Sequence, residues 1–395
     1  MGRYIIPPPT SSCSRQGSRP AGEQDEWRVL ACDEAHDRAG APVVSDSQLV
    51  IYVVTPYGRK GGSSRVRVFE WLDRIAEPRV VSSYISHHNA SASEVASHPV
   101  AVLAAERRLR RMAAQQPERL LLHREASPLS RGALERSLLS SSGFSIYDFD
   151  DALQWDWGAG SRLRRIAPKA PKTLIAAQTA DRVVAGNPVL AEWAAEHNRD
   201  VVMIPSCVAP DRYSPKTDYT VGDPPRMGWI GSANNESYLQ VVASALREVH
   251  RRTGARLTLI GTTRPTLGNL EDIIDRVAWS EPIQYALLSE LDVGLAPVPD
   301  GLYTRGKSGY KLLQYAAAGT PVVASPVGVN REILSALQMP APEGADEWAD
   351  AILDVLTRPV EARAALGRRA REVTELNYSF DAWLPRWRAA MGLGG

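Results

Sequence analysis

The chain has 395 residues, with 46 Lys and Arg against 45 Asp and Glu, and 44% of it is hydrophobic. This length allows two domains, the apolar content excludes a wholly disordered chain, and a net charge of +1 argues against a nucleic-acid-binding protein. The three cysteines, Cys13, Cys32 and Cys207, suit neither a disulfide framework nor a zinc site. No apolar run approaches the length of a membrane span, about 18 residues, and the sequence shows no secretion signal. We therefore expect a cytoplasmic protein.

The first ordered element is expected near residue 48. Residues 1–47 are rich in Pro, Ser, Gly and charge, and we interpret them as a disordered extension because they have little apolar surface to bury. Residues 48–55 are a continuous apolar, β-branched run that predicts a buried parallel strand. A glycine-rich loop at 58–65 follows, and an amphipathic helix is predicted over 66–75.

Strand-like and helix-like segments then alternate as far as residue 212. Strands are predicted at 120–123, 145–147, 182–185 and 201–204, with a helix at 188–196. Such alternation predicts a parallel sheet with helices on both faces. Residues 213–225 contain three prolines and no periodic pattern, so we interpret them as a linker.

The same alternation begins again after the linker. The predicted elements are strands at 226–231, 256–260, 291–296 and 321–324 and helices at 237–253 and 308–318. The last segment, 379–391, carries large apolar residues at helical spacing and suits a helix that packs across two domains. The sequence therefore predicts an α/β protein in which two Rossmann-like domains face each other across a cleft. The predicted parts are an extension at 1–47, a first domain at 48–212, a linker at 213–225, a second domain at 226–378 and a crossing helix at 379–395.

Charge is distributed unevenly between the domains. Residues 48–220 carry 23 basic and 18 acidic side chains, a net charge of +5. One predicted helix holds a cluster of arginines, and a second cluster follows it: Arg107, Arg108, Arg110, Arg111, then Arg162, Arg164 and Arg165. These clusters fit solvated helix faces, or alternatively a surface for anionic lipid or an acidic carrier protein.

The start of the helix predicted over 308–318 is a candidate phosphate site. Free backbone N–H groups and the helix dipole favour anions at such an end. The residues there are basic, small or hydroxylated: Arg305, Gly306, Lys307, Ser308, Gly309 and, one turn later, Lys311. Because the chain has only six lysines, two of them four residues apart at this position indicate a diphosphate site.

Two glycine-containing loops are further candidates. In the second domain, Gly231 and Ser232 end the strand 226–231. In the first domain, the loop supplies backbone donors, hydroxyls and a cation through Gly61, Gly62, Ser63, Ser64 and Arg65. Neither loop has the residue order of a P-loop or of a dinucleotide-binding fingerprint. Small-residue loops on both sides of a cleft suit a substrate linked to a nucleotide.

Polar residues follow two strands of the first domain. His123 ends the strand 120–123, where it could contact a substrate or make a structural hydrogen bond. Asp148 and Asp150 form a D-x-D that in other proteins holds a divalent metal, but we favour polar contacts to a substrate or loop capping and expect no metal. Arg124 and Asp151 lie beside these residues in the sequence, and Asp150 is a candidate base.

Taken together, these motifs resemble glycosyltransferase family 4. The resemblance runs from about residue 50 to the C-terminus. It rests on GGSSRVRVFEWL, IYDFDDAL, VVAGNPVLAEWA, MGWIGS, DVGLAPVPDG and, most specifically, RGKSGYKLLQYAAAGTPVVASPVGVN. It implies the GT-B fold and transfer of a sugar from a nucleotide diphosphate sugar with retention of configuration. It also implies no cofactor or bound metal, a donor on the second domain and an acceptor on the first. With this arrangement Ser63, Ser64, Arg124 and Asp151 are expected on the acceptor side, the D-x-D is expected to make acceptor contacts, and His123 could contact the sugar or the acceptor.

The sequence departs from the family pattern at two places. The family's pair of Glu eight residues apart is replaced by Gly306 and Gln314. Gln314 can still hydrogen-bond a ribose hydroxyl through its amide. The family's Arg and Lys after the second-domain glycine turn are also absent. We therefore expect the diphosphate charge to be balanced by Lys307, Arg305 or Arg65, with Lys307 as the first catalytic candidate.

The predicted function is that of a retaining glycosyltransferase. With no evident carboxylate nucleophile, a front-face path is expected, in which the leaving phosphate helps to deprotonate the acceptor. The acceptor remains open among a small metabolite, a carrier-bound intermediate, a glycan and a lipid. The alternatives are a nucleotide-sugar epimerase or phosphorylase with the same two-domain fold, or a sugar-nucleotide-binding subunit without catalysis.

Overall fold

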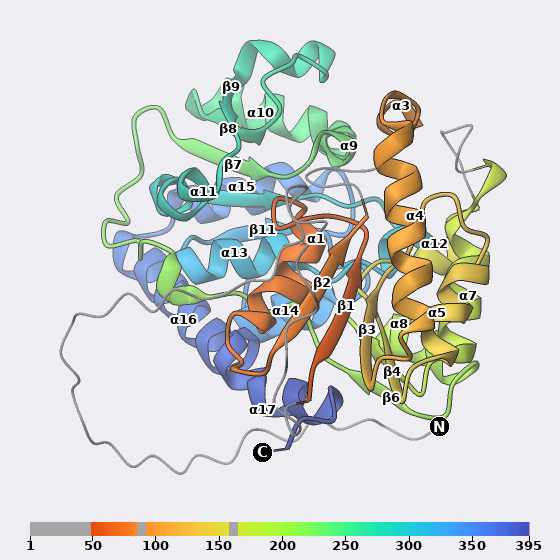
Figure 1. Cartoon of the computed structure of the whole chain (residues 1–395). Helices are drawn as coiled ribbons and strands as arrows, with labels where there is room; N and C mark the ends of the chain where they lie inside the picture. The colour runs from red at the N-terminus through yellow and green to blue at the C-terminus, as the bar shows by residue number, and fades with distance from the viewer. Residues whose placement is uncertain (1–48, 85–91, 158–164, 395) are drawn as a thin grey trace. The chain divides into compact units, whose positions relative to one another are not determined.

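The structure is a computed structural model that describes residues 49–84, 92–157 and 165–394 (Figure 1). The extension predicted at 1–47 lies outside the described residues, as do Arg162 and Arg164. The described residues contain two sheets in which every pair of neighbouring strands is parallel. The predicted α/β fold with two Rossmann-like domains is confirmed.

The sheet of the first domain has the strand order β2-β1-β3-β4-β5-β6. Its strands are β1 (Ile51–Thr55), β2 (Arg79–Ser83), β3 (Arg119–His123), β4 (Phe144–Phe149), β5 (Arg182–Ala185) and β6 (Val201–Met203). Both faces of the sheet are buried, which is why the strands read as continuous apolar runs. Val54 and Leu122 belong to the core on one face, and Val53 and Leu121 to the core on the other. The order reverses between β1 and β3, a point where ligands bind in open α/β sheets.

Helices cover both faces of this sheet. They are α1 (Gly62–Ser64), η1 (Arg65–Phe69), α2 (Glu70–Leu72), α3 (Ala92–Ser97), α4 (Pro99–Ala114), α5 (Ala133–Ser140), η2 (Leu153–Trp155), α7 (Lys169–Thr179), α8 (Pro188–Ala195) and η3 (Pro210–Arg212). The prediction of a loop as far as residue 65 was wrong, since the helical run begins at Gly62. The Ser64 hydroxyl hydrogen-bonds Thr55 at the end of β1, which holds these small residues against the sheet in helical geometry.

The sheet of the second domain has the order β11-β10-β7-β8-β9. Its strands are β7 (Arg226–Ile230), β8 (Arg256–Gly261), β9 (Ile274–Ala278), β10 (Val293–Ala296) and β11 (Val322–Ala324). Its helices are α9 (Ala233–Glu236), η4 (Ser237–Val242), α10 (Ala243–Thr253), η5 (Gly268–Ile273), α11 (Glu281–Leu287), η6 (Leu288–Glu290), α12 (Leu302–Arg305), α13 (Tyr310–Ala318), α14 (Asn330–Leu337), α15 (Glu347–Thr357) and α16 (Val360–Tyr378). The order reverses between β7 and β10.

Helix α13 begins two residues later than predicted. Gly309 has φ +64°, a left-handed conformation that interrupts the helix before Tyr310. A Cβ at Gly309 would lie 2.6 Å from Ile333 Cδ1, so this turn has no room for a larger residue. Lys307 and Ser308 therefore lie in the connection before α13 rather than in its first turn.

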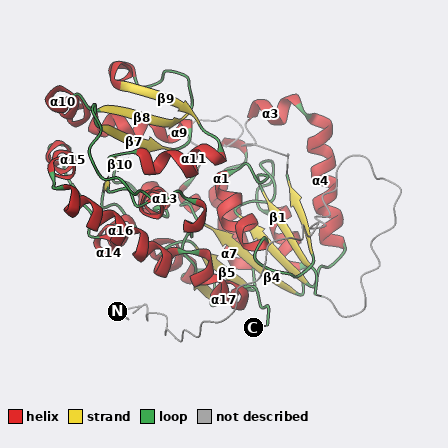
Figure 2. Ribbon diagram, turned by 90° about the vertical axis from the view of Figure 1, so that its left-hand side faces the viewer, coloured by secondary structure: helices red, strands yellow, loops and turns green. Residues whose placement is uncertain are grey.

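The chain returns to the first domain at its C-terminal end (Figure 2). Helix α17 (Phe380–Ala390) follows α16 and packs on α2. The Trp71 ring stacks on Trp387 at a centroid distance of 5.6 Å and meets Phe380 edge-on at 4.7 Å. Val208 exchanges backbone hydrogen bonds with the two residues that flank Ser379. The predicted crossing helix is confirmed.

Candidate active site

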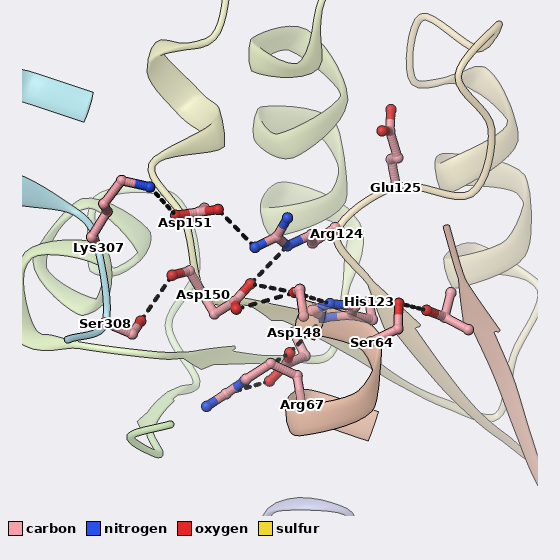
Figure 3. A network of polar contacts seen from close by, with 12 residues as sticks. Ser64, Arg67, His123, Arg124, Glu125, Asp148, Asp150, Asp151, Lys307 and Ser308 are labelled. Atoms are coloured by element: carbon pink, nitrogen blue, oxygen red, sulfur yellow. Dashed lines mark hydrogen bonds and ion pairs between the residues drawn. The ribbon is translucent and has the colours of Figure 1, made fainter. Parts of the chain in front are cut away.

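Four polar side chains of the first domain form a hydrogen-bonded chain at the carboxyl ends of β3 and β4. Ser63 Oγ lies 2.8 Å from His123 Nε2, and His123 Nδ1 lies 2.8 Å from Asp148 Oδ1. Ser63 also donates to Asp150 Oδ1 over 2.9 Å. His123 has no exposed surface, so the direct contact with a sugar or acceptor considered for it is not open to its ring. Figure 3 shows His123 close to Asp148 and Asp150.

Arg67 holds Asp148 from the side opposite His123 (Figure 3). Its Nη2 lies 2.5 Å from Asp148 Oδ2 and its Nε 3.2 Å from Oδ1, a bidentate pair with both side chains buried. Arg67 Nη1 donates to the carbonyl oxygens of Ile204 and Pro205. Burial alone would raise the pKa of Asp148, but the Arg67 charge and the His123 hydrogen bond outweigh it and lower this pKa. Asp148 is therefore a carboxylate, and Arg67 is a site residue that the sequence analysis missed.

Arg124 binds Asp150 and Asp151, the two neighbouring carboxylates that follow β4. Its Nε lies 2.7 Å from Asp150 Oδ1 and its Nη2 2.7 Å from Asp151 Oδ2. Its backbone is left-handed, with φ +61°, and Tyr147 Oη donates to its carbonyl oxygen. Strained non-glycine residues of this kind cluster at functional sites. Burial would raise the pKa of Asp150, but Arg124, His123 and Arg67 together hold this pKa well below its usual range. Asp150 is consequently a weak base.

The connection before α13 contacts this cluster (Figure 3). Lys307 Nζ lies 3.5 Å from Asp151 Oδ1, and Ser308 Oγ donates to the Asp150 carbonyl oxygen over 2.8 Å. Asn187, the residue before α8, donates to the Gly306 carbonyl oxygen. The structure thus brings the candidate phosphate residues of the second domain next to the candidate acceptor residues of the first.

Lys311 reaches from α13 to the glycine turn that ends β7. Its Nζ lies 5.2 Å from the centre of the Trp229 ring, and a Cβ at Gly231 would lie 3.0 Å from its Cε. That Cβ would also come within 2.6 Å of the Trp229 ring, which explains the glycine. Burial and then the Lys307 charge lower the pKa of Lys311 to about 8. Lys311 therefore places a cation beside the turn where the family's own Arg and Lys are missing.

Arg65 extends from the first domain to α11. Its side chain is largely buried, with the guanidinium 5.4 Å from the Trp279 ring and Nη1 3.6 Å from Glu281 Oε1. Among the described residues, Arg65 Nη1 is one of few buried polar side-chain atoms without a hydrogen-bond partner. An unused donor on a buried cation is ready for an anionic or carbonyl oxygen. Trp279 is a further residue that the sequence analysis missed.

Gln314 lies in the interior of α13 and is buried. Its Nε2 is 3.3 Å from both Tyr213 Oη and Gln284 Oε1. Gln284 Nε2 in turn has no hydrogen-bond partner among the described residues. The Gln314 and Gln284 amides therefore lie side by side, and the Gln284 Nε2 donor is not used by any described residue.

The remaining predicted residues lie at the edges of the site. Gly61 has no room for a side chain, because a Cβ there would lie 2.4 Å from Tyr57 Cβ, whereas Gly62 has open space. Ser64 is buried against Thr55, and Ser232 is exposed. Arg305 forms an exposed ion pair with Asp300 at 2.6 Å, so its charge is directed to a surface partner.

Helix α4 has an exposed side that is both basic and apolar. Arg107, Arg110 and Arg111 are exposed, and Val100 and Leu103 are 80% and 48% exposed. Arg108 instead turns inward and donates to Ser82 Oγ. Contact with anionic lipid or an acidic carrier through this side stays a prediction. In the part of the chain that the structure describes, no helix is long and apolar enough to cross a membrane.

The family comparison matches the second domain. Residues 224–358 match the family described as Glycosyl transferases group 1. The matched range includes the glycine turn at Gly231, Lys307, Lys311 and Gln314, so the second-domain candidates for donor binding lie within it. No match was found among curated protein sequences.

Solved structures with the same fold include a glycosyltransferase. Anabaena Alr3699/HepE in complex with UDP and glucose has a TM-score of 0.61 at 12% identity, covering 87% of this chain and all of that one. WaaG, a glycosyltransferase involved in lipopolysaccharide biosynthesis, has a TM-score of 0.60 at 14% identity, covering 88% and 100%. S. aureus TarM has a TM-score of 0.54 at 13% identity and covers 72% of this chain, which spans 58% of TarM. The GT-B fold and the resemblance to glycosyltransferases are confirmed, while membership of family 4 stays a prediction.

Proposed function

We propose that the protein transfers a sugar, with retention of configuration, from a nucleotide diphosphate sugar to an acceptor hydroxyl. The observation that carries this proposal is the position of Lys311 beside the Gly231 turn, at the point where the strand order of the second sheet reverses. The UDP and glucose in the HepE structure and the UDP in the TarM structure, both of the same fold, support a nucleotide sugar.

In this proposal the second domain binds the donor. Lys311 and Lys307 balance the diphosphate, and negative charge that builds on the leaving group strengthens both interactions as the glycosidic bond breaks. Gln314 and Gln284 offer amide groups to the ribose. Arg65 adds a free donor from the first domain.

The first domain orients the acceptor. Arg124 fixes the carboxylates of Asp150 and Asp151 beside the loop that carries Lys307. The Arg124 charge keeps Asp150 ionised, so the Asp150 carboxylate accepts hydrogen bonds from sugar or acceptor hydroxyls better than it removes a proton. Holding donor and acceptor in one geometry supplies a large part of the rate enhancement in such a reaction.

A donor screen tests the proposal. A nucleotide sugar present at about 100 times its dissociation constant should stabilise the fold by about 2.7 kcal/mol, which a thermal-shift assay detects. The donor that binds is then incubated with and without candidate acceptors, and the sugar products are identified by mass spectrometry and NMR. Conversion of the donor without any acceptor would instead support an epimerase. Binding without turnover across a broad acceptor panel would support a non-catalytic binding subunit.

A further inference from the structure

The position of His123 raises the question of how it takes part in the reaction. Its ring is completely buried, Asp148 occupies Nδ1 and Ser63 occupies Nε2. A histidine with both nitrogens engaged and no exposed surface acts on a substrate only through one of its partners. Asp148 is buried as well, whereas Ser63 is partly exposed. Ser63 is therefore the member of this chain that a substrate can reach.

The hydrogen bonds allow Ser63 and His123 two protonation arrangements. Asp148 is a carboxylate held by Arg67, so His123 Nδ1 carries a proton and donates a hydrogen bond to Asp148. The single Ser63 hydroxyl proton points either to His123 Nε2 or to the Asp150 carboxylate, 2.9 and 3.1 Å away. In the first arrangement His123 is neutral. The second holds one proton more, on Nε2, so that His123 is an imidazolium that donates to Ser63 Oγ, and no heavy atom has to move to reach it.

We propose that Ser63 takes the proton of the acceptor hydroxyl and passes its own proton to His123 Nε2 during sugar transfer. This inference rests on the proposed function and assigns a proton path to it. The acceptor oxygen forms its bond to the anomeric carbon, the bond from that carbon to the diphosphate oxygen breaks, and its electron pair leaves with the diphosphate. The acceptor proton moves to Ser63 Oγ while the Ser63 proton moves to His123. A hydroxyl, an imidazole and a carboxylate in this order are the arrangement that activates oxygen nucleophiles in other enzymes.

Asp148 and Arg67 are positioning residues in this path. Asp148 fixes the ring so that Nε2 faces Ser63, and Arg67 fixes Asp148 through two hydrogen bonds. His123 contacts the Asp148 carboxylate, and Asp150 lies on the far side of Ser63. Each of these two carboxylates is paired with its own guanidinium, that of Arg67 for Asp148 and that of Arg124 for Asp150.

The decisive variant is Ser63→Ala, which removes the hydroxyl and leaves the Arg67–Asp148 and Arg124–Asp150 ion pairs intact. We expect kcat to fall about 10²-fold or more, as for loss of a general base, with donor affinity by calorimetry unchanged within about twofold. Ser63→Thr, which restores a hydroxyl, should recover the rate. Ser335→Ala, an exposed serine of α14, is the matched control and should keep wild-type kinetics.

Wild-type kcat in Ser63→Ala would overturn this inference alone and favour proton transfer directly to the leaving phosphate. Failure of the wild type to bind any nucleotide sugar, or to transfer its sugar, would overturn the proposed function and this inference together. The melting temperature of Ser63→Ala is measured first and should equal that of the wild type. A loss of kcat then cannot be attributed to a loss of folded protein.

Discussion

The pH dependence of donor binding should reveal the role of Lys311. The pKa of Lys311 is lowered to about 8, first by burial and then by the neighbouring Lys307, while Asp151 acts in the opposite direction. A diphosphate beside Lys311 favours the ammonium form, so donor affinity should be full below pH 8 and fall as the pH rises above it. From pH 7 to pH 9 the protonated fraction drops about tenfold, and the donor affinity should drop by the same factor, about 1.4 kcal/mol.

Isothermal titration calorimetry with the donor found by the screen measures this directly. The diphosphate of a nucleotide sugar has no group that titrates between pH 7 and 9, so the slope belongs to the protein. Lys311→Arg should remove the pH dependence, because a guanidinium stays charged over this range. Lys311→Ala should bind weakly at every pH. Wild-type affinity that stays constant from pH 7 to 9, or an equal slope in Lys311→Ala, would refute the reasoning.

Three further predictions follow from the same site. Lys307→Ala should lower kcat on the order of 10²-fold and weaken nucleotide binding less, because charge on the leaving group grows in the transition state. Near-wild-type kcat in steady-state assays would remove Lys307 from the mechanism. Asp148→Asn should lower the free energy of unfolding by about 3–5 kcal/mol in urea titrations, because it leaves the Arg67 charge buried without its partner, and a loss below about 1 kcal/mol would contradict this. EDTA should leave sugar transfer intact, since Asp148 and Asp150 are held by guanidinium groups, and rescue of a chelated enzyme by Mn²⁺ or Mg²⁺ would show otherwise.

The interior strands were predictable from the sequence, whereas two outer strands were not. β1 and β5 are continuous apolar runs because both of their faces are covered, and such runs identify a buried parallel strand. β2 and β9 lie at the edges of their sheets and carry polar residues, as in Arg79–Ser83 and Ile274–Ala278. β2 and β9 are only partly buried, and their polar residues interrupt the apolar signal, whereas the edge strands β6 and β11 are short apolar runs and were predicted.

The site was predictable residue by residue but not as a set of contacts. Strand ends and glycine loops indicated Ser63, His123 and Asp150, because parallel strands place their carboxyl ends together. No sequence pattern gives the Ser63 to His123 hydrogen bond, which joins residues 60 positions apart. The contact of Lys311 with the Gly231 turn likewise depends on where α13 begins. The left-handed backbone of Gly309 determines that start.

The return of α17 to the first sheet means that this domain is encoded in two separate stretches of the gene. Phe380 and Trp387 complete the core around Trp71, so a fragment that stops at residue 212 would leave a large aromatic surface uncovered. A chimaera that exchanges acceptor domains between related enzymes must therefore carry residues 379–394 together with the N-terminal half. Recombination at the 213–225 linker alone would join each first domain to a foreign closing helix, and such hybrids should be recovered only where the aromatic contacts at Trp71 are preserved.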